Sequence, residues 1–411
     1  MKFLAEEFIV EEIDVYGNRL KINTTFQPAN ADDNEDNEDA KFVHFILQKT
    51  NWNTTDALAE IARKLHCSNK KFDFAGTKDR SSISTQMASG FAIDYQRLMA
   101  LTIKDIKILG AWKQTSKIRL GQLLGNGFTI TLNATNSNFD GNAQRIIDKL
   151  NKSENQIPNY FGNQRFGSLR QNSALMGKLL LKQDFQGAVE NYLMYTTESE
   201  KEEFKIARNK LKDEGDYSKA MQYFPKALGF EKKLLSHLVN LPNDYAGALR
   251  KLPRTLLLLF IHAYQSNIFN QVAKIRNEKK LLNTPLKSDF IAPIGEYGFV
   301  ELDKCEPVGL QIEVAKERIE SKKYVLASKL IGPNQEVSDF ELQFLKNDGL
   351  NIEDFQMKGM PELNCNGTIR ALNFPLKDFS IKSTEKADEA VLDFIIPSGC
   401  YATVALEELM S

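Results

Sequence analysis

The chain has 411 residues, of which 42% are hydrophobic and 26% charged, and its formal net charge is −1. This length favours two domains, and the nearly neutral charge excludes a protein that attracts nucleic acid by overall charge alone. The four cysteines form no Cys-x-x-Cys pair and the four histidines have no metal-ligand spacing, which argues against a zinc ribbon or a redox dithiol and fits a reducing compartment.

The first predicted elements are two strands, at residues 19–26 and 41–48, in which hydrophobic and polar residues alternate, and the second is predicted to pair with the first. Residues 32–39 between them carry six carboxylates, so this segment is predicted to be a disordered acidic tip. A helix is predicted next, because residues 53–56 form a capping sequence. Its apolar face consists of Leu58, Ile61, Ala62 and Leu65.

The most informative segment is 75–86, where Asp79 lies in a glycine-containing turn between Lys78 and Arg80. Residues 71–74 and 82–88 on either side are predicted strands, so Asp79 is expected at a strand end. Neighbouring cations favour the ionised form of a carboxylate, which can then act as a nucleophile or a base. Taken alone, however, this segment is more often an ordinary surface turn.

Helices dominate the middle of the chain, after a predicted strand pair at 118–132. Strands at both ends with helices between them predict one α+β domain interrupted by an insertion. The apolar run 256–261 is too short to span a bilayer and no secretory signal is visible, so a cytoplasmic location is predicted. The predicted helices are 142–151, 173–182, 184–194, 255–276 and 402–410, and the closing strand is 391–396.

Basic residues gather in two stretches. Residues 156–182 contain Arg165, Arg170 and two lysines but no acid, and residues 245–280 contain seven basic residues, including Arg254, and one acid. Such segregation is typical of a phosphate-binding face, and solvated helix faces explain it equally well.

Six motifs follow one another along the chain, and together they closely resemble the TruD family of pseudouridine synthases. The resemblance covers essentially the whole chain, and six motifs in order are far stronger evidence than any one of them. They are Glu7-Phe8-Ile9-Val10-Glu11-Glu12, Gly76-x-Lys78-Asp79-Arg80, Gly125-Asn126-x-Phe128, Pro-Asn-Tyr-Phe-Gly-Asn-Gln-Arg-Phe-Gly at 158–167, Ala-Tyr-Gln-Ser-Asn-Ile-Phe-Asn at 263–270 and Pro-Ser-Gly-Cys-Tyr-Ala-Thr at 397–403.

The resemblance implies an α+β fold, in which a mixed-sheet pseudouridine synthase catalytic domain is interrupted by a helix-rich α/β insertion, the TRUD domain. The catalytic domain would comprise residues 1–155 and 371–411, and the insertion 156–370. The implied activity is isomerisation of uridine to pseudouridine in tRNA, principally at uridine 13, with an aspartate acting on a flipped base. No cofactor or metal is expected, and we expect a monomer.

The resemblance also implies roles for single residues. Asp79 corresponds to the family's catalytic aspartate, and Asn126 and Phe128 to residues close to it. Tyr401 matches the aromatic residue of the closing motif, and Lys2 the lysine ahead of the first strand.

Chemical reasoning adds further candidates and alternatives. Lys78 and Arg80 are expected to contact phosphate or to tune the aspartate. Phe128 and Tyr401 are expected to receive a flipped base, with plain core packing as the alternative. Asn126 would bond either the uracil edge or the aspartate's loop. Phosphates are expected to contact Arg165, Arg170 and Arg254.

The chain departs slightly from the family pattern. Gly127 occupies a position that is often larger in relatives, which is expected to loosen Phe128, and Cys400 replaces a common serine. The main rival is a non-catalytic RNA-binding or RNA-folding protein on the same scaffold. Two others are an RNA methyltransferase, which the missing glycine-rich nucleotide loop disfavours, and an acidic interaction module around 32–39.

Overall fold

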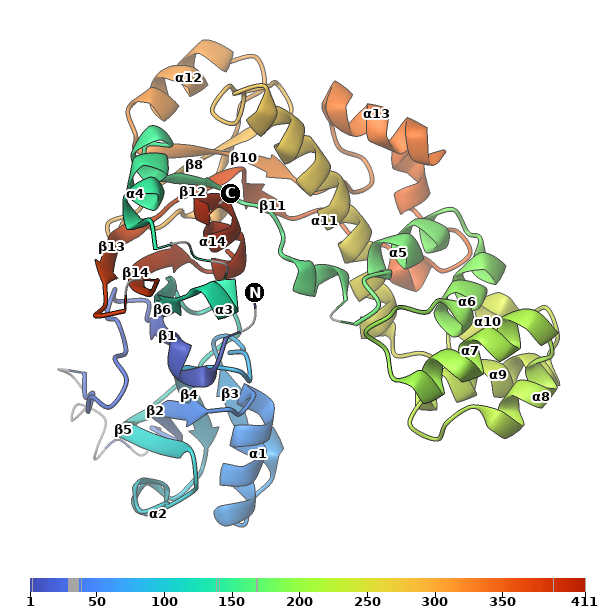
Figure 1. Ribbon diagram of the computed structural model, residues 1–411, viewed down its shortest axis with the longest axis horizontal. Coiled ribbons are helices and arrows are strands. Elements are labelled where there is room, and N and C mark those ends of the chain that lie inside the picture. Colours follow the sequence, from blue (N-terminus) through green and yellow to red (C-terminus); the bar gives the residue numbers. More distant parts are fainter. Residues whose placement is uncertain are drawn as a thin grey trace. The chain divides into compact units, whose positions relative to one another are not determined.

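The structure is a computed structural model that describes residues 1, 3–28, 37, 39–137, 139, 141–167, 169–386 and 388–410. It divides into two units (Figure 1). Unit 1 comprises Met1–Ile157, Ile294–Val300 and Phe374–Ser411, and unit 2 comprises Pro158–Pro293 and Glu301–Asn373. These limits lie within a few residues of the predicted ones, except that residues 294–300 return to unit 1.

Unit 1 is built on a mixed sheet, as predicted. The strand order is β13-β14-β6-β1-β4-β2-β5, and β3 pairs with β4. β1 and β4 run parallel, whereas the other described pairs of this sheet are antiparallel. The strands are β1 (Phe8–Ile13), β2 (Phe42–Thr50), β3 (Phe72–Phe74), β4 (Ile83–Phe91), β5 (Ile106–Gln114), β6 (Gly125–Leu132), β13 (Lys377–Ser383) and β14 (Ala390–Pro397).

The helices of unit 1 pack on one face of this sheet and bury its apolar residues. The side chains of β2 and β4 pack with α1 and α2 in one cluster, and those of β1, β6 and β14 with α4 and α14 in another. α1 begins where predicted, because the Asn53 side chain accepts a hydrogen bond from the Asp56 amide. The helices are α1 (Thr54–Lys64), α2 (Tyr95–Met99), α3 (Ala134–Ser137), α4 (Ala143–Lys152) and α14 (Ala402–Met410).

Unit 2 combines a helical cluster with a four-stranded sheet of order β11-β10-β8-β9. The predicted helices 173–182, 184–194 and 255–276 are confirmed as α5, α6 and α11. A Cβ on Gly177 of α5 would lie 2.1 Å from the Phe260 carbonyl oxygen of α11, so glycine permits the close approach of these helices. The helices are α5 (Ser173–Leu181), α6 (Phe185–Met194), α7 (Glu202–Glu214), α8 (Tyr217–Tyr223), α9 (Gly229–Asn240), α10 (Tyr245–Leu249), α11 (Arg254–Glu278), α12 (Ile312–Glu320) and α13 (Asp339–Asp348).

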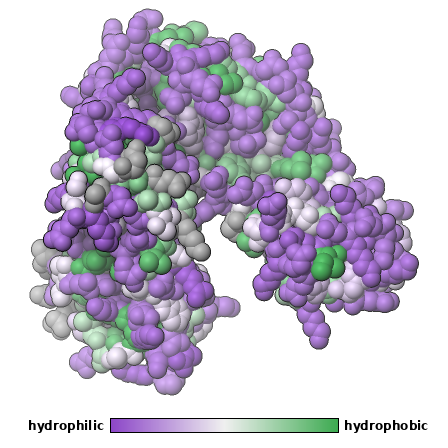
Figure 2. All heavy atoms as spheres, viewed as in Figure 1, coloured by the Kyte–Doolittle hydropathy of each residue, from purple (hydrophilic) through white to green (hydrophobic). Residues whose placement is uncertain are grey.

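The remaining strands are short. β8 (Phe290–Pro293), β9 (Glu306–Pro307), β10 (Tyr324–Lys329) and β11 (Ile369–Ala371) form the sheet of unit 2, and β7 (Gln156–Pro158) pairs with β12 (Asn373–Pro375). In the face shown in Figure 2 the surface is mostly hydrophilic, with small separate hydrophobic patches.

Two strand predictions were wrong. Residues 19–26 form no strand, because side chains accept hydrogen bonds from backbone amides in the middle of this segment. The Ile22 amide donates to the Glu11 carboxylate, and the Asn23 amide donates to the side-chain oxygen of Gln48. The strand at 41–48 was correct, but β4 and β5 are its partners. Of the predicted pair at 118–132, only β6 is a strand. Most of the acidic tip at 32–39 lies outside the described residues.

Candidate active site

Asp79 lies in the connection between β3 and β4, which we call the Asp79 loop (residues 75–82). Four residues separate Asp79 from the end of β3, so it does not stand at a strand end as expected. Asp79 is exposed. A substrate can therefore reach this carboxylate without any rearrangement of the core.

Side chains from α1 and β4 hold the backbone at the start of this loop. The Thr54 hydroxyl accepts a hydrogen bond from the Lys78 amide at 2.9 Å and donates to Gln86 Oε1 at 2.8 Å. Gln86 Nε2 in turn donates to the carbonyl of Gly76 at 3.0 Å. Thr54 and Gln86 are buried residues of α1 and β4, so their hydrogen bonds hold the loop backbone in a fixed position relative to the helix and the sheet.

The Lys78 ammonium group points to the core rather than to Asp79 or to solvent. It forms an ion pair of 2.6 Å with Glu12 of β1, and both side chains are buried. The other Glu12 oxygen accepts a hydrogen bond from the Met87 amide at 3.0 Å. Burial raises the pKa of Glu12, and Lys78 opposes this shift. Two motifs of the sequence, the opening strand and Gly-x-Lys-Asp, are thus joined by one buried ion pair.

A second lysine, Lys49, lies beneath the loop, and sequence reasoning missed it. Its Nζ donates to the carbonyls of Trp52 at 2.6 Å, Asp79 at 3.0 Å and Lys78 at 3.3 Å. Lys49 shares the alternation of Val43, Phe45 and Leu47 on β2, so its side chain lies on their buried face. A lysine at a core-facing strand position was the signal available in the sequence.

The end of the loop is held by Ser82 and Arg80. The Ser82 hydroxyl donates to the Asp79 carbonyl at 2.9 Å. Arg80 is exposed, and its Nε donates to the carbonyl of Asn51 at 3.2 Å.

Asn126 and Phe128 lie on the sheet face that carries Glu12. In the ladder of β1 and β6, Asn126 is opposite Glu12 and Phe128 is opposite Val10, and paired side chains share a face. The buried Asn126 Oδ1 has no hydrogen-bond partner among the described residues. A buried oxygen without a partner can accept a hydrogen bond from a donor group of a ligand.

Phe128 itself is largely a core residue. Its ring lies 5.6 Å from the Phe394 ring in a stacked arrangement and 5.8 Å from the Phe8 ring edge-to-face. Gly127 lies against the Arg19 side chain: a Cβ there would lie 2.5 Å from Arg19 Nε. The expected loosening of Phe128 stays a prediction.

Tyr401 directly precedes α14 and is half-buried. Its carbonyl accepts the Ala405 amide, so it forms the N-terminal end of that helix. Lys2 lies outside the described residues.

The two motifs of unit 2 are explained by contacts between them. Asn270 of α11 accepts a hydrogen bond from the Phe161 amide at 2.8 Å and donates to its carbonyl at 2.9 Å. The Arg370 guanidinium lies 3.9 Å from the Phe161 ring centre and donates to Asn159. These contacts give the aromatic motif at 158–167 a structural role within unit 2.

The three arginines expected to bind RNA all have partners within unit 2. Arg165 donates to the Ser266 hydroxyl at 3.0 Å, Arg170 to the Tyr192 carbonyl at 2.7 Å, and Arg254 to the Glu362 carbonyl at 2.7 Å. Arg254 is exposed, whereas the other two are half-buried.

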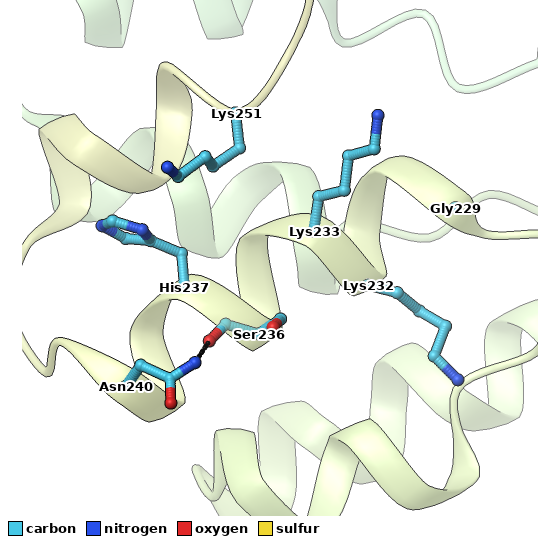
Figure 3. A pocket seen from close by; sticks show the side chains of 7 residues that line it. All are labelled: Gly229, Lys232, Lys233, Ser236, His237, Asn240 and Lys251. Atoms are coloured by element: carbon cyan, nitrogen blue, oxygen red, sulfur yellow. Dashed lines mark hydrogen bonds between the residues drawn. The ribbon is translucent and has the colours of Figure 1, made fainter.

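A separate basic groove of about 670 Å³ lies along α9 in unit 2 (Figure 3). Lys232 and Lys233 project from the first turn of α9, and Lys251 comes from the segment before α11. His237 Nε2 lies 2.8 Å from Asp244 Oδ2. The lining residues are Gly229, Lys232, Lys233, Ser236, His237, Asn240 and Lys251, none of which is acidic.

Within the described ranges, no cluster of three His, Cys, Asp or Glu side chains is arranged to hold a metal ion. Within the same ranges, no helix combines the length and apolarity that a membrane span requires.

The chain resembles known proteins over nearly its whole length. The family model of tRNA pseudouridine synthase D (TruD) matches residues 1–409. A protein named probable tRNA pseudouridine synthase D from Methanosarcina acetivorans is 31% identical, over 99% of this chain and 91% of its own. A protein of the same name from Methanosarcina mazei is 32% identical, over 92% of this chain and 89% of its own length. A crystal structure of the TruD protein from Methanosarcina mazei matches with a TM-score of 0.79 and 30% identity, covering 99% and 92% of the two chains.

Proposed function

This chain belongs to the TruD family of tRNA pseudouridine synthases, and we propose that it isomerises uridine 13 of tRNA with Asp79 as the catalytic residue. The observation that carries the proposal is the Asp79 loop: Thr54 and Lys49 hold its backbone and Glu12 holds the Lys78 side chain, while Asp79 itself is exposed. A preorganised, accessible carboxylate is what the chemistry requires.

The reaction rearranges one nucleotide. The bond between ribose C1′ and uracil N1 breaks, the base turns over, and a bond from C1′ to C5 forms. The C5 proton is lost to solvent and N1 gains a proton, so no electron or group donor is consumed. Asp79 supplies the carboxylate that starts the cleavage, as a nucleophile or a base, and assists removal of the C5 proton.

The proposed nucleotide contacts rest on the family resemblance and on the position of Asn126 and Phe128 on the sheet face that carries Glu12. Asn126 Oδ1, buried without a described partner, accepts a hydrogen bond from the flipped uracil. Tyr401 stacks against the base, and Phe128 supports this wall from the core. The exposed Arg80 contacts the flanking phosphate, whereas Lys78 acts through Glu12. Lys2 is retained as a candidate from the resemblance alone.

The basic groove on α9 is the phosphate-binding surface that the structure of unit 2 favours most. It collects three lysines and no lining acid in one concave surface. Arg165, Arg170 and Arg254 remain candidates; their guanidinium groups donate to protein carbonyls or hydroxyls, as Lys232 of the groove does to the Phe224 carbonyl. Because the groove gathers its lysines on one concave surface, we propose it first as a contact for the tRNA backbone.

Release of tritium from C5 of uridine tests this function. With a tRNA labelled at C5 of its uridines, wild type is expected to release one equivalent, and a transcript in which uridine 13 is replaced by cytidine none. The substitution Asp79→Asn keeps the shape of the side chain but removes its carboxylate. The rate of tritium release is therefore expected to fall roughly 10²–10⁴-fold, while tRNA binding persists.

The outcomes separate the alternatives. Full activity of Asp79→Asn contradicts the catalytic assignment, and release from the uridine 13 variant contradicts the target. Binding of tRNA by wild type without any release favours the non-catalytic RNA-binding protein.

A further inference from the structure

Lys49 is completely buried, and its ammonium group donates its hydrogen bonds to backbone carbonyls. Its side chain rises from β2 beneath the Asp79 loop and is 0% exposed. An ammonium group has three donors, and Lys49 has three carbonyl partners, those of Trp52, Lys78 and Asp79. Two of the three acceptors, the carbonyls of Lys78 and Asp79, belong to the peptide groups on the two sides of the Asp79 Cα.

The presence of a lysine at this position calls for an explanation, because its burial is energetically unfavourable. Burying an ammonium group costs free energy, and an apolar residue would fill the same place on the core face of β2 without that cost. Burial lowers the pKa of Lys49 to about 8; the charge of Lys78 adds to this shift and Asp79 opposes it. The last interaction means that the charges of Lys49 and Asp79 attract each other.

We propose that Lys49 is the positioning residue of the Asp79 loop: by holding the carbonyls of Lys78 and Asp79, it fixes the direction in which the catalytic carboxylate leaves the backbone. This inference rests on the proposed function and goes beyond it, because Lys49 contacts no reacting atom. Ser82 holds the same Asp79 carbonyl from within the loop, whereas Lys49 ties it to the sheet.

A purely structural role is the alternative, and unit 1 offers a control of the same chemistry. Lys71, directly before β3, is a half-buried lysine whose Nζ donates to the carbonyl of Ala92 at 3.1 Å. Lys71→Met therefore removes a lysine–carbonyl hydrogen bond from the same unit and leaves the carbonyls of Lys78 and Asp79 bonded to Lys49.

The test compares wild type, Lys49→Met and Lys71→Met. Single-turnover tritium release is expected to fall about 100-fold in Lys49→Met, with the Kd for tRNA within about threefold, because a small misplacement of a catalytic group has this effect. Lys71→Met is expected to retain the wild-type rate per folded molecule. Equal rates for both variants, corrected for the folded fraction, would overturn the proposal.

Amide hydrogen exchange provides a readout that does not need activity. In Lys49→Met, exchange at residues 76–82 is expected to accelerate at least about tenfold, while the rest of unit 1 keeps its protection. Unchanged protection of the loop would reject the positioning role even if wild type proved inactive on tRNA. Lack of activity in wild type would instead count against the proposed function.

Discussion

At the scale of single residues, the Asp79 loop depends on ion pairing in the core of unit 1. Lys78 and Glu12 come from motifs 66 positions apart and meet with only 4% and 1% of their side chains exposed. Removing one partner of such a pair leaves an uncompensated charge in a low-dielectric environment, which costs more than the pair itself contributes.

Glu12→Gln is expected to destabilise unit 1 by about 3–5 kcal/mol, because it leaves the Lys78 ammonium buried without an opposite charge. Urea unfolding of the variant and wild type measures this. Glu60→Gln breaks the exposed pair with Arg63 and is expected to change the unfolding free energy very little. A similarly small effect of Glu12→Gln would show that Lys78 finds solvent or another partner.

The lowered pKa of Lys49 makes stability depend on pH with an unusual sign. The folded state releases the Lys49 proton near pH 8, whereas the unfolded chain holds it up to about 10.5. Between these values the unfolded state binds more protons, so stability rises with pH. From pH 7 to pH 10, wild type is expected to gain about 2.5 kcal/mol relative to Lys49→Met. Denaturant unfolding at both pH values measures the difference, and a constant difference would contradict it.

The sequence predicted some of these residues and not others for a physical reason. Asp79, Asn126 and Tyr401 lie in motifs and can be recognised locally. The partners of Lys78 and the role of Lys49 depend on which strands become neighbours, and β1 meets β4 only through a parallel pairing that local alternation does not encode.

At the scale of elements, the predictions succeeded where packing follows the local period and failed where side chains take over backbone hydrogen bonds. α5, α6, α11, β14 and α14 have one continuous apolar face or core, and their bounds agree with the predictions. Residues 19–26 alternate like a strand, but Glu11 and Gln48 accept their amides, so no ladder forms.

The basic groove on α9 leads to a prediction about salt. Replacing Lys232, Lys233 and Lys251 by alanine is expected to raise KM for tRNA with kcat unchanged. The slope of log affinity against log salt is expected to become shallower by about 2–3, since each phosphate contact contributes close to one unit.

Fluorescence titration of tRNA binding at several salt concentrations measures this slope. The control removes three exposed lysines from other parts of unit 2, Lys316, Lys323 and Lys346, and so matches the change in net charge. If the two triple variants bind alike, the groove is no specific contact and only overall charge matters.

At the scale of the whole molecule, each unit has its own hydrophobic clusters. Those of unit 1 are formed by its sheet and by α1, α2, α4 and α14, and that of unit 2 mainly by α5 to α11. Heat is therefore expected to unfold the protein in two calorimetric transitions rather than one. Leu234→Ala in α9 is expected to lower one transition by several degrees and leave the other in place. A single transition that shifts as a whole would show that the units unfold together.

The order of strands in unit 1 also has a consequence for protein synthesis. β14 pairs with β6, yet about 250 residues, including all of unit 2, are translated between them. At typical elongation rates the edge of β6 stays unpaired for roughly 10–50 s on the ribosome. An open strand edge beside apolar residues invites pairing with other nascent chains. Asn126 and Phe128 lie on that edge, so the proposed wall of the active site belongs to a strand edge that stays open to other chains during translation.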